Sequence, residues 1–208
     1  MENSEHRILE AAEAEFVQKG YDGTKTTAIA RRAGVTHAML HYYFGSKERL
    51  YEQVLESKTR ELSRSIVEAF SQPGRTLTDR LRDGIGLHFD YLTAHPDLPR
   101  FVINEAARRD GIQLPLVRGV MRRIRCVVGR LQAEADALCR SEGRPPVSLR
   151  RLLLDVVSLN VFTVTACPLL CRLYEMPREE FLALRRAEII ETALRRLKGD
   201  GAAPVSAD

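Results

Sequence analysis

The stretch TTAIARRAGVTHAMLHYYF, residues 26–44, has the layout of two short helices joined at a glycine. Thr26 is a residue type that favours the N-terminal cap of a helix, where its hydroxyl contributes about 1 kcal/mol relative to alanine. Ala30 is small enough for two helices to approach closely, and Gly34 falls at the turn, where a positive φ would strain other residues. The stretch therefore predicts a helix-turn-helix with helices over 27–33 and 37–44.

The second of these helices divides into an inner and an outer face. The residues expected to form the core shared by the two helices are Ile29, Ala33, Val35 and Leu40, with Phe44 or Tyr43 behind them. Subtracting them leaves small, polar and aromatic residues facing outward: Thr36, His37, Ala38, His41 and Tyr42. The second helix of such a unit enters the DNA major groove with its N-terminal residues at base edges, while flanking residues hold phosphates. The outer face is therefore a candidate DNA-binding surface.

His37 and His41 are four residues apart, which places them side by side on one helix face. A helical zinc motif would need a glutamate directly after the first histidine, and Ala38 stands there. No third and fourth ligands lie nearby in the sequence, so the pair makes a poor metal site. Two solvated polar side chains are the second alternative. Because the exposed face of a helix-turn-helix is the one that docks on DNA, a DNA-reading role is favoured, and we expect no metal and no cofactor.

Residues 20–50, GYDGTKTTAIARRAGVTHAMLHYYFGSKERL, resemble the DNA-binding region of the TetR family of bacterial regulators. The resemblance rests on an aromatic residue and a glycine before a threonine pair, on IAxxAGV, on a YYF ending and on SKExL directly after it. It implies that His37, Ala38 and His41 face bases or the sugar-phosphate edge. It implies phosphate contacts for Thr26, Thr27, Tyr42, Tyr43 and Lys47. Met39 departs from the family pattern, where a small polar residue is more frequent, and is left out of the expected set.

Lys47 has a second argument that does not depend on the resemblance. It lies in the first turn of a helix that Ser46 is expected to cap. Backbone N–H groups and the helix dipole favour an anion at such an N-terminus. A phosphate contact at Lys47 is therefore expected on both grounds.

The composition permits this interpretation without proving it. The 208 residues, 44% apolar and 29% charged, can build one sizeable core or a small domain joined to a larger one. The formal charge of +4 tolerates a polyanionic partner but does not identify one. The four cysteines form no CxxC pair and the first residues contain no apolar secretory segment, so a reducing cytoplasm is expected. With no phosphate-cradling glycine motif, zinc set or nucleophile elbow, an enzyme is not expected.

Helical periodicity recurs along the whole chain, which predicts an all-α fold. We expect a helix-turn-helix domain over 1–48, a larger helical domain over 49–198 and a disordered tail over 199–208. The stretch 152–170 approaches membrane-spanning length, but it carries six polar or helix-breaking residues. A helix that is apolar nearly all round is more often buried on several sides inside a protein, so no membrane span is expected.

For the larger domain, the resemblance implies dimerisation and the binding of a small-molecule effector. The homodimer is expected to be a repressor that binds a palindromic operator in double-stranded DNA and leaves it when the effector binds. The last two helices are the natural dimer elements, since they could pair across a two-fold axis as a four-helix bundle. The alternative is that the same apolar stripe packs within one chain. A mixed apolar and polar effector pocket is expected where polar or aromatic residues interrupt apolar faces: His88, Tyr91, Phe101, Asn104, Asn160, Phe162 and Thr163. Each of these could instead be a satisfied core residue. The alternative function is a helical protein-interaction module that keeps a helix-turn-helix without specific DNA binding.

Overall fold

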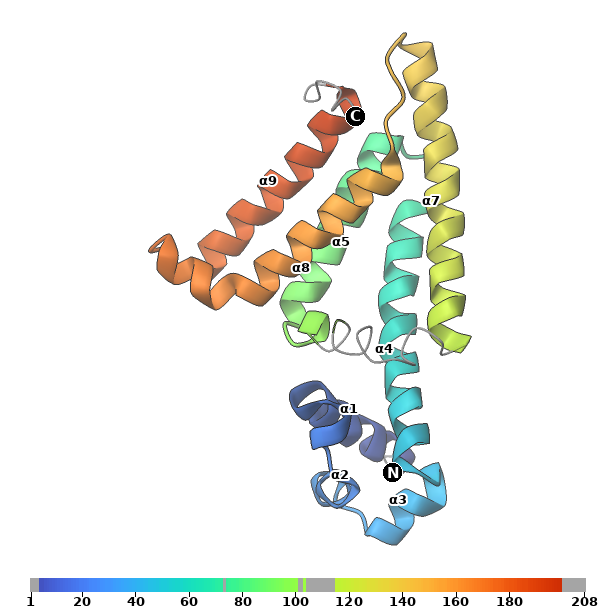
Figure 1. The fold of residues 1–208 in the computed structure, drawn as a ribbon, viewed down its shortest axis with the longest axis vertical. Helices are drawn as coiled ribbons and strands as arrows, with labels where there is room; N and C mark the ends of the chain where they lie inside the picture. Colours follow the sequence, from blue (N-terminus) through green and yellow to red (C-terminus); the bar gives the residue numbers. More distant parts are fainter. Residues whose placement is uncertain (1–3, 73, 101–102, 104–114, 200–208) are drawn as a thin grey trace, which may run out of the picture. The chain divides into compact units, whose positions relative to one another are not determined.

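The computed structural model describes residues 4–72, 74–100, 103 and 115–199 (Figure 1). All regular elements in these ranges are helices, which confirms the predicted all-α fold. The helices are α1 (Ser4–Gly23), α2 (Thr26–Ala33), α3 (His37–Phe44), α4 (Lys47–Phe70), α5 (Leu77–Ala94), α7 (Pro115–Ser141), α8 (Leu149–Leu173) and α9 (Arg178–Lys198).

The chain forms two compact units. The first contains residues 1–61 and 97–118, and the second contains residues 62–96 and 119–208. Helix α4 begins in the first unit and ends in the second. The domain boundary expected at residue 48 stays a prediction. It would place nearly the whole of α4 in the larger domain, whereas the first unit includes α4 up to residue 61.

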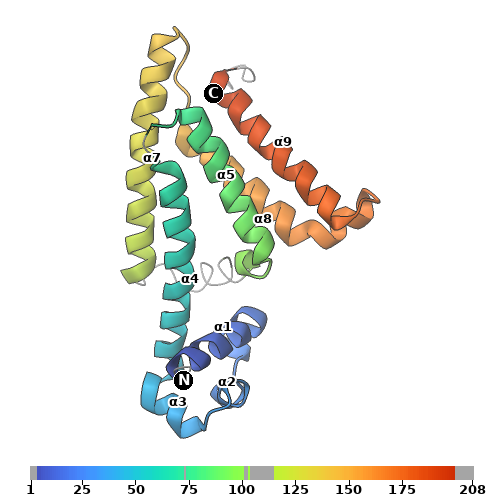
Figure 2. The same cartoon turned by 180° about the vertical axis from the view of Figure 1, so that it is seen from behind.

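Helices α1, α2 and α3 of the first unit pack around a small apolar core (Figure 2). Its completely buried side chains are Ile8, Phe16, Ile29, Leu40 and Leu50. Of the shared core predicted for the helix pair, Ile29, Ala33, Leu40 and Phe44 are buried, Val35 is half-buried and Tyr43 is exposed. The amphipathic pattern of the two short helices thus identified their inner faces correctly.

The turn between α2 and α3 depends on Gly34, as expected. Its φ of 64° and ψ of 36° are left-handed, a conformation that costs glycine little. The N–H of Val35 donates to the carbonyl of Ala30 over 3.0 Å, which closes the end of α2. The predicted cap at Thr26 is wrong: Lys25 is the N-cap residue of α2, without a side-chain bond, and Thr26 is already helical.

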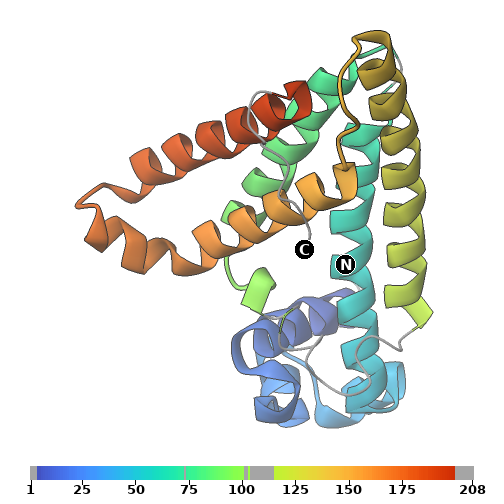
Figure 3. The same ribbon diagram turned by 45° about the horizontal axis from the view of Figure 1, so that its top comes forward.

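The core of the second unit lies between α5, α7, α8 and α9 (Figure 3). Its most buried large side chains are Leu81, Ile85, Phe89, Leu131, Leu149, Leu152 and Leu197. Arg186 of α9 holds α5 through two 2.8 Å hydrogen bonds, from Nε and Nη2, to the carboxylate of Asp90. Gly86 makes room for this contact, because a Cβ at that position would lie 2.5 Å from Arg186 Nη2.

By length and composition alone, helix α8 is long and apolar enough to cross a membrane. Within the structure, 33% of its most apolar stretch is buried. One face packs in the core through Leu152, Val156 and Val164, among others. The other face leaves large apolar side chains exposed: Leu154, Val157, Phe162, Leu169 and Leu173. The predicted burial on several sides is therefore not achieved within one chain.

Candidate functional site

The first turn of α3 presents the expected polar face. Thr36 caps the helix, its side-chain oxygen accepting a 3.2 Å hydrogen bond from the N–H of Met39. The exposed His37 follows, and its Nε2 lies 2.9 Å from Oγ1 of Thr26. Because Thr26 is the first residue of α2, this bond joins the beginnings of the two helices and orients the His37 ring.

The two histidines are side by side, with ring centroids 4.4 Å apart and planes 76° apart. His41 Nδ1 lies 2.8 Å from the carbonyl oxygen of Gly45. A carbonyl can only accept, so Nδ1 carries the proton, and the neutral His41 ring presents Nε2 as an acceptor. The face can thus offer both donors and acceptors, which is what contacts with base edges and phosphates require. No group of three or more metal-ligand side chains occurs among the described residues.

Two tyrosines extend this face beyond the histidines. Tyr42 is 85% exposed and Tyr43 is 40% exposed, and their rings meet edge to face with centroids 5.3 Å apart. A tyrosine ring as exposed as that of Tyr42 gains little from the fold, so its place on the surface fits a contact with a partner. Of the other expected residues, Thr27, Thr36 and Ala38 are exposed, and Thr26 and Lys47 are half-buried. All nine belong to the first unit.

Lys47 is positioned by Tyr21, the aromatic residue that forms part of the family resemblance, although the sequence did not indicate this contact. Its Nζ lies 4.3 Å from the ring centroid of Tyr21, a cation–π contact. The Tyr21 hydroxyl donates to the carboxylate of Glu48 and thereby lowers the pKa of that carboxyl. Ser46 caps α4 as predicted, since its Oγ accepts from the N–H of Arg49 over 3.2 Å. The lysine therefore lies at a helix N-terminus, with its ammonium group over the Tyr21 ring.

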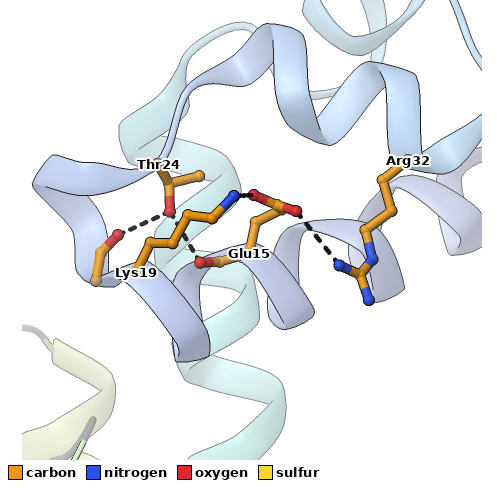
Figure 4. Close-up of polar contacts among 5 residues, drawn as sticks. Glu15, Lys19, Thr24 and Arg32 are labelled. Carbon is orange, nitrogen blue, oxygen red and sulfur yellow. Dashed lines mark hydrogen bonds and ion pairs between the residues drawn. The ribbon is translucent and has the colours of Figure 1, made fainter.

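A buried carboxylate joins α1 to α2 behind this face (Figure 4). Glu15 is 6% exposed, and its oxygens lie 2.5 Å from Lys19 Nζ and 3.3 Å from Arg32 Nη1. The hydrogen bond from Lys19 is the main cause that lowers the pKa of Glu15, and Arg32 adds to it. Thr24, also buried, places its hydroxyl 3.0 Å from the Glu15 carbonyl and 2.8 Å from that of Gly20. These contacts fix where α2, and with it α3, begins.

The comparisons with known proteins agree with this geometry. Residues 8–54, which contain the whole helix-turn-helix, match the family described as bacterial regulatory proteins, tetR family. This helix-turn-helix region belongs to the TetR family. Among curated TetR-like relatives, the HTH-type transcriptional repressor SCO4008 of Streptomyces coelicolor is 32% identical over 114 residues, 55% of each chain. The HTH-type transcriptional repressor NicS of Pseudomonas putida is 32% identical over 101 residues, 47% of this chain and 46% of the relative.

The chain spans about half the length of the curated relatives that it matches. Solved structures match over more of it. The putative transcriptional regulator SCO4942 of Streptomyces coelicolor covers 94% of this chain and 98% of its own, with a TM-score of 0.68 and 23% identity. The transcriptional regulator FadR of Bacillus subtilis, in complex with stearoyl-CoA, covers 91% and 97%, with a TM-score of 0.66 and 18% identity. At these identities the likeness concerns the fold.

The residues expected to form the effector pocket do not lie together in one cavity. His88 lines a cavity of about 130 Å³ inside the second unit, and the side chain of Asn160 hydrogen-bonds to the His88 ring. Phe162 and Thr163 line a separate groove between α8 and α9, beside Tyr174 and Phe181. Tyr91 stacks on His95, with ring centroids 4.4 Å apart. Phe101 and Asn104 lie outside the described residues.

Proposed function

We propose that the chain is a sequence-specific DNA-binding transcriptional regulator that inserts α3 into the major groove. The observation that carries the proposal is the outer face of α3. His37, His41 and Tyr42 are exposed together at a capped helix start, over a core that is completely buried at Ile29 and Leu40. In this arrangement His37, Ala38 and His41 contact bases or sugars. Thr26, Thr27, Thr36, Tyr42, Tyr43 and Lys47 then contact the phosphate backbone on either side.

The exposed apolar face of α8 and its groove with α9 support a homodimer. In a single chain, large apolar side chains there remain exposed to water. A second copy placed across a two-fold axis would bury them in a four-helix bundle. A two-fold dimer binds an approximately palindromic operator, with half-sites about 34–36 Å apart. Because DNA is the partner, the dimer works in the cytoplasm of a bacterium.

We also propose that a small molecule bound in the second unit controls DNA binding, as a repressor released by its effector. A ligand that binds one of two dimer geometries more tightly shifts the population toward that geometry, and the operator selects the other. The names of SCO4008 and NicS as repressors favour repression, although the TetR-like relative FasR of Mycolicibacterium smegmatis, 36% identical over 89 residues, is an activator.

Binding of the purified chain to labelled DNA fragments from both sides of its own gene tests the proposal. Salt and unlabelled nonspecific DNA are titrated against each fragment, since a specific complex survives competitor that removes the phosphate-dominated nonspecific one. We expect one fragment to be retained and the His37→Ala/Tyr42→Ala double variant to lose it while keeping its helicity. Equal binding to every fragment, and to fragments selected from the whole genome, would favour the interaction module without specific DNA binding.

A further inference from the structure

Two of the four cysteines lie next to each other on α8. The Sγ atoms of Cys167 and Cys171 are 3.6 Å apart, and α8 continues without a break through Pro168, which stands between them. Residues four positions apart lie on one face of a helix, so the helix itself holds the two thiols together. The exposed Leu169 is two positions from each cysteine, which places it on the opposite side of α8. The thiols therefore do not lie on the face that the homodimer is proposed to bury.

The two thiols face the core of the second unit. Cys167 is 3% exposed and belongs to the same core as Phe181. Cys171 is half-buried and packs against that core, so a reagent in solution reaches its sulfur first. Burial is the main cause that raises the pKa of the Cys167 thiol, and its contact with Cys171 adds to this effect. The Cys167 thiol therefore stays protonated near pH 7.

A direct disulfide between the two thiols fits this geometry poorly. A disulfide needs sulfurs about 2.05 Å apart and Cβ atoms about 3.5–4.5 Å apart, whereas residues i and i+4 of a helix have Cβ atoms about 5–6 Å apart. Helix α8 would have to deform before the sulfurs could close from 3.6 Å to bonding distance. An atom that bonds to both sulfurs at once requires no such movement.

The distance between the sulfurs selects the geometry of the bridging atom. With bonds of about 2.3 Å, the length of a zinc–thiolate bond, a linear bridge holds the sulfurs about 4.6 Å apart and a bridge bent to about 100° holds them about 3.5 Å apart. The 3.6 Å between Cys167 and Cys171 fits the bent bridge. The bridging atom therefore has tetrahedral or pyramidal geometry.

The number of ligands distinguishes these two geometries. A tetrahedral zinc site takes four ligands, and no group of three or more histidine, cysteine, aspartate or glutamate side chains that could hold a metal occurs in the described part of the chain. A metal cation would also require both thiols to lose their protons, which burial opposes at Cys167. A pyramidal centre with three bonds, two of them to sulfur and neutral as a whole, avoids both difficulties.

Trivalent arsenic is such a centre, and its reaction with two thiols balances without an oxidant. When an oxide R–As=O meets the pair, both S–H bonds and the arsenic–oxygen bond break, and two arsenic–sulfur bonds form. One water molecule leaves with the two thiol protons. Arsenic stays trivalent, and the product carries no charge, which suits a site that is largely buried among apolar side chains.

We propose that Cys167 and Cys171 together bind a trivalent arsenic centre through two arsenic–sulfur bonds. An organic arsenical keeps its carbon group as the third substituent, and inorganic arsenite keeps a hydroxyl group there. The site lies in the second unit, and its occupation does not depend on DNA binding by the first unit.

Phenylarsine oxide is the organic probe and sodium arsenite the inorganic one. The reduced full-length chain is mixed with each probe and with excess 2-mercaptoethanol, and the arsenic retained is measured by mass spectrometry of the intact protein. One thiol loses arsenic to the competitor, whereas two thiols of one chain act as a chelate, which raises the affinity by roughly 10²–10⁴-fold. We expect one phenylarsenic group per chain, located on the tryptic fragment between Arg151 and Arg172. Retention of arsenite as well would show that the third substituent need not be organic.

Three variants test which thiols are responsible. Cys171→Ser and Cys167→Ala should each lower the affinity for phenylarsine oxide by roughly 10²–10⁴-fold, because each leaves a single sulfur. Cys126→Ser removes an exposed thiol from α7 and is the matched control, which should bind like the wild type. Circular dichroism checks the fold, and Cys171→Ser, which leaves the buried Cys167 in place, carries the test if Cys167→Ala does not fold.

The proposal is overturned if the competitor removes phenylarsine oxide from the wild type as readily as from Cys171→Ser. Zinc chloride bound by the reduced chain as tightly as phenylarsine oxide would also overturn it, because a complete metal site would then exist. A phenylarsenic group found on a fragment without Cys167 and Cys171 has the same consequence.

Discussion

The Thr26 hydroxyl lies 2.9 Å from Nε2 of His37, so that the first residue of α2 orients the first residue of α3. Both residues are proposed to touch DNA, and their hydrogen bond makes the two contacts interdependent. We expect Thr26→Val and His37→Gln each to weaken operator binding. In the double variant the loss of binding free energy should be about 1 kcal/mol smaller than the sum of the two single losses. Fluorescence anisotropy with a labelled operator measures the four affinities. Additive effects would show that the bond does not survive in the complex.

A second prediction concerns Glu15, whose carboxylate joins Lys19 of its own helix to Arg32 of α2. Glu15→Gln should lower the free energy of unfolding by about 1 kcal/mol near pH 7, because the buried carboxylate then loses its charge-assisted bonds to the exposed cations Lys19 and Arg32. Since the folded state lowers the pKa of Glu15, this stabilisation is complete above the usual carboxyl range and disappears as the pH falls below it. Urea denaturation at pH 7 and pH 4 should therefore give a smaller difference at the lower pH.

Glu10→Gln is the matched control for that experiment. Glu10 lies on the same helix, in an exposed pair with His6 at 3.3 Å. Exposed ion pairs contribute little, so a change within about 0.5 kcal/mol is expected. If Glu15→Gln behaves like Glu10→Gln, the buried network does not hold the helix-turn-helix together.

The helix-turn-helix could be predicted from the sequence because its signals are local. The inner residues, the glycine turn and the Ser46 cap all act within a few positions of one another. The predicted N-cap of α2 was wrong because the hydroxyl groups near its start have partners that are distant in the sequence. Three threonines occur in GTKTT, and the Thr24 hydroxyl is engaged by the carbonyls of Glu15 and Gly20, while Thr26 reaches forward to His37. Which hydroxyl caps a helix depends on partners up to eleven positions away.

The effector residues were harder to predict for the same physical reason. His88 and Asn160 are 72 positions apart, and only the packing of α5 on α8 makes them hydrogen-bond partners. A polar residue on an apolar helical face indicates burial but not which cavity it faces. Phe162 and Thr163, close to Asn160 in sequence, consequently line a different groove. Periodicity likewise indicated that α8 is apolar, but not which of its apolar side chains stay exposed in one chain.

A third prediction tests the proposed homodimer. Phe162 is 61% exposed and Leu169 is 68% exposed on α8. A charge introduced there cannot be buried against a second copy, so Phe162→Arg and Leu169→Arg should convert the dimer to a monomer. Sedimentation velocity measures the change. Arg151→Ala, an exposed residue near the start of the same helix, should remain dimeric. A wild-type chain that sediments as a monomer at micromolar concentration would contradict the proposed dimer directly.

The last prediction follows from the burial that lowers the pKa of His88 to about 4. The unfolded chain binds a proton at this imidazole below about pH 6.5, whereas the folded chain does not, so the unfolded state gains stability as the pH falls between these values. The unfolding free energy of the wild type should therefore fall by about 2 kcal/mol more between pH 7 and pH 5 than that of His88→Gln. The comparison cancels the other groups that titrate in this range. His6→Gln, which removes an exposed histidine, should keep the wild-type dependence. Parallel curves for the wild type and His88→Gln would mean that the imidazole is solvated in the folded protein, which would contradict its burial against Asn160.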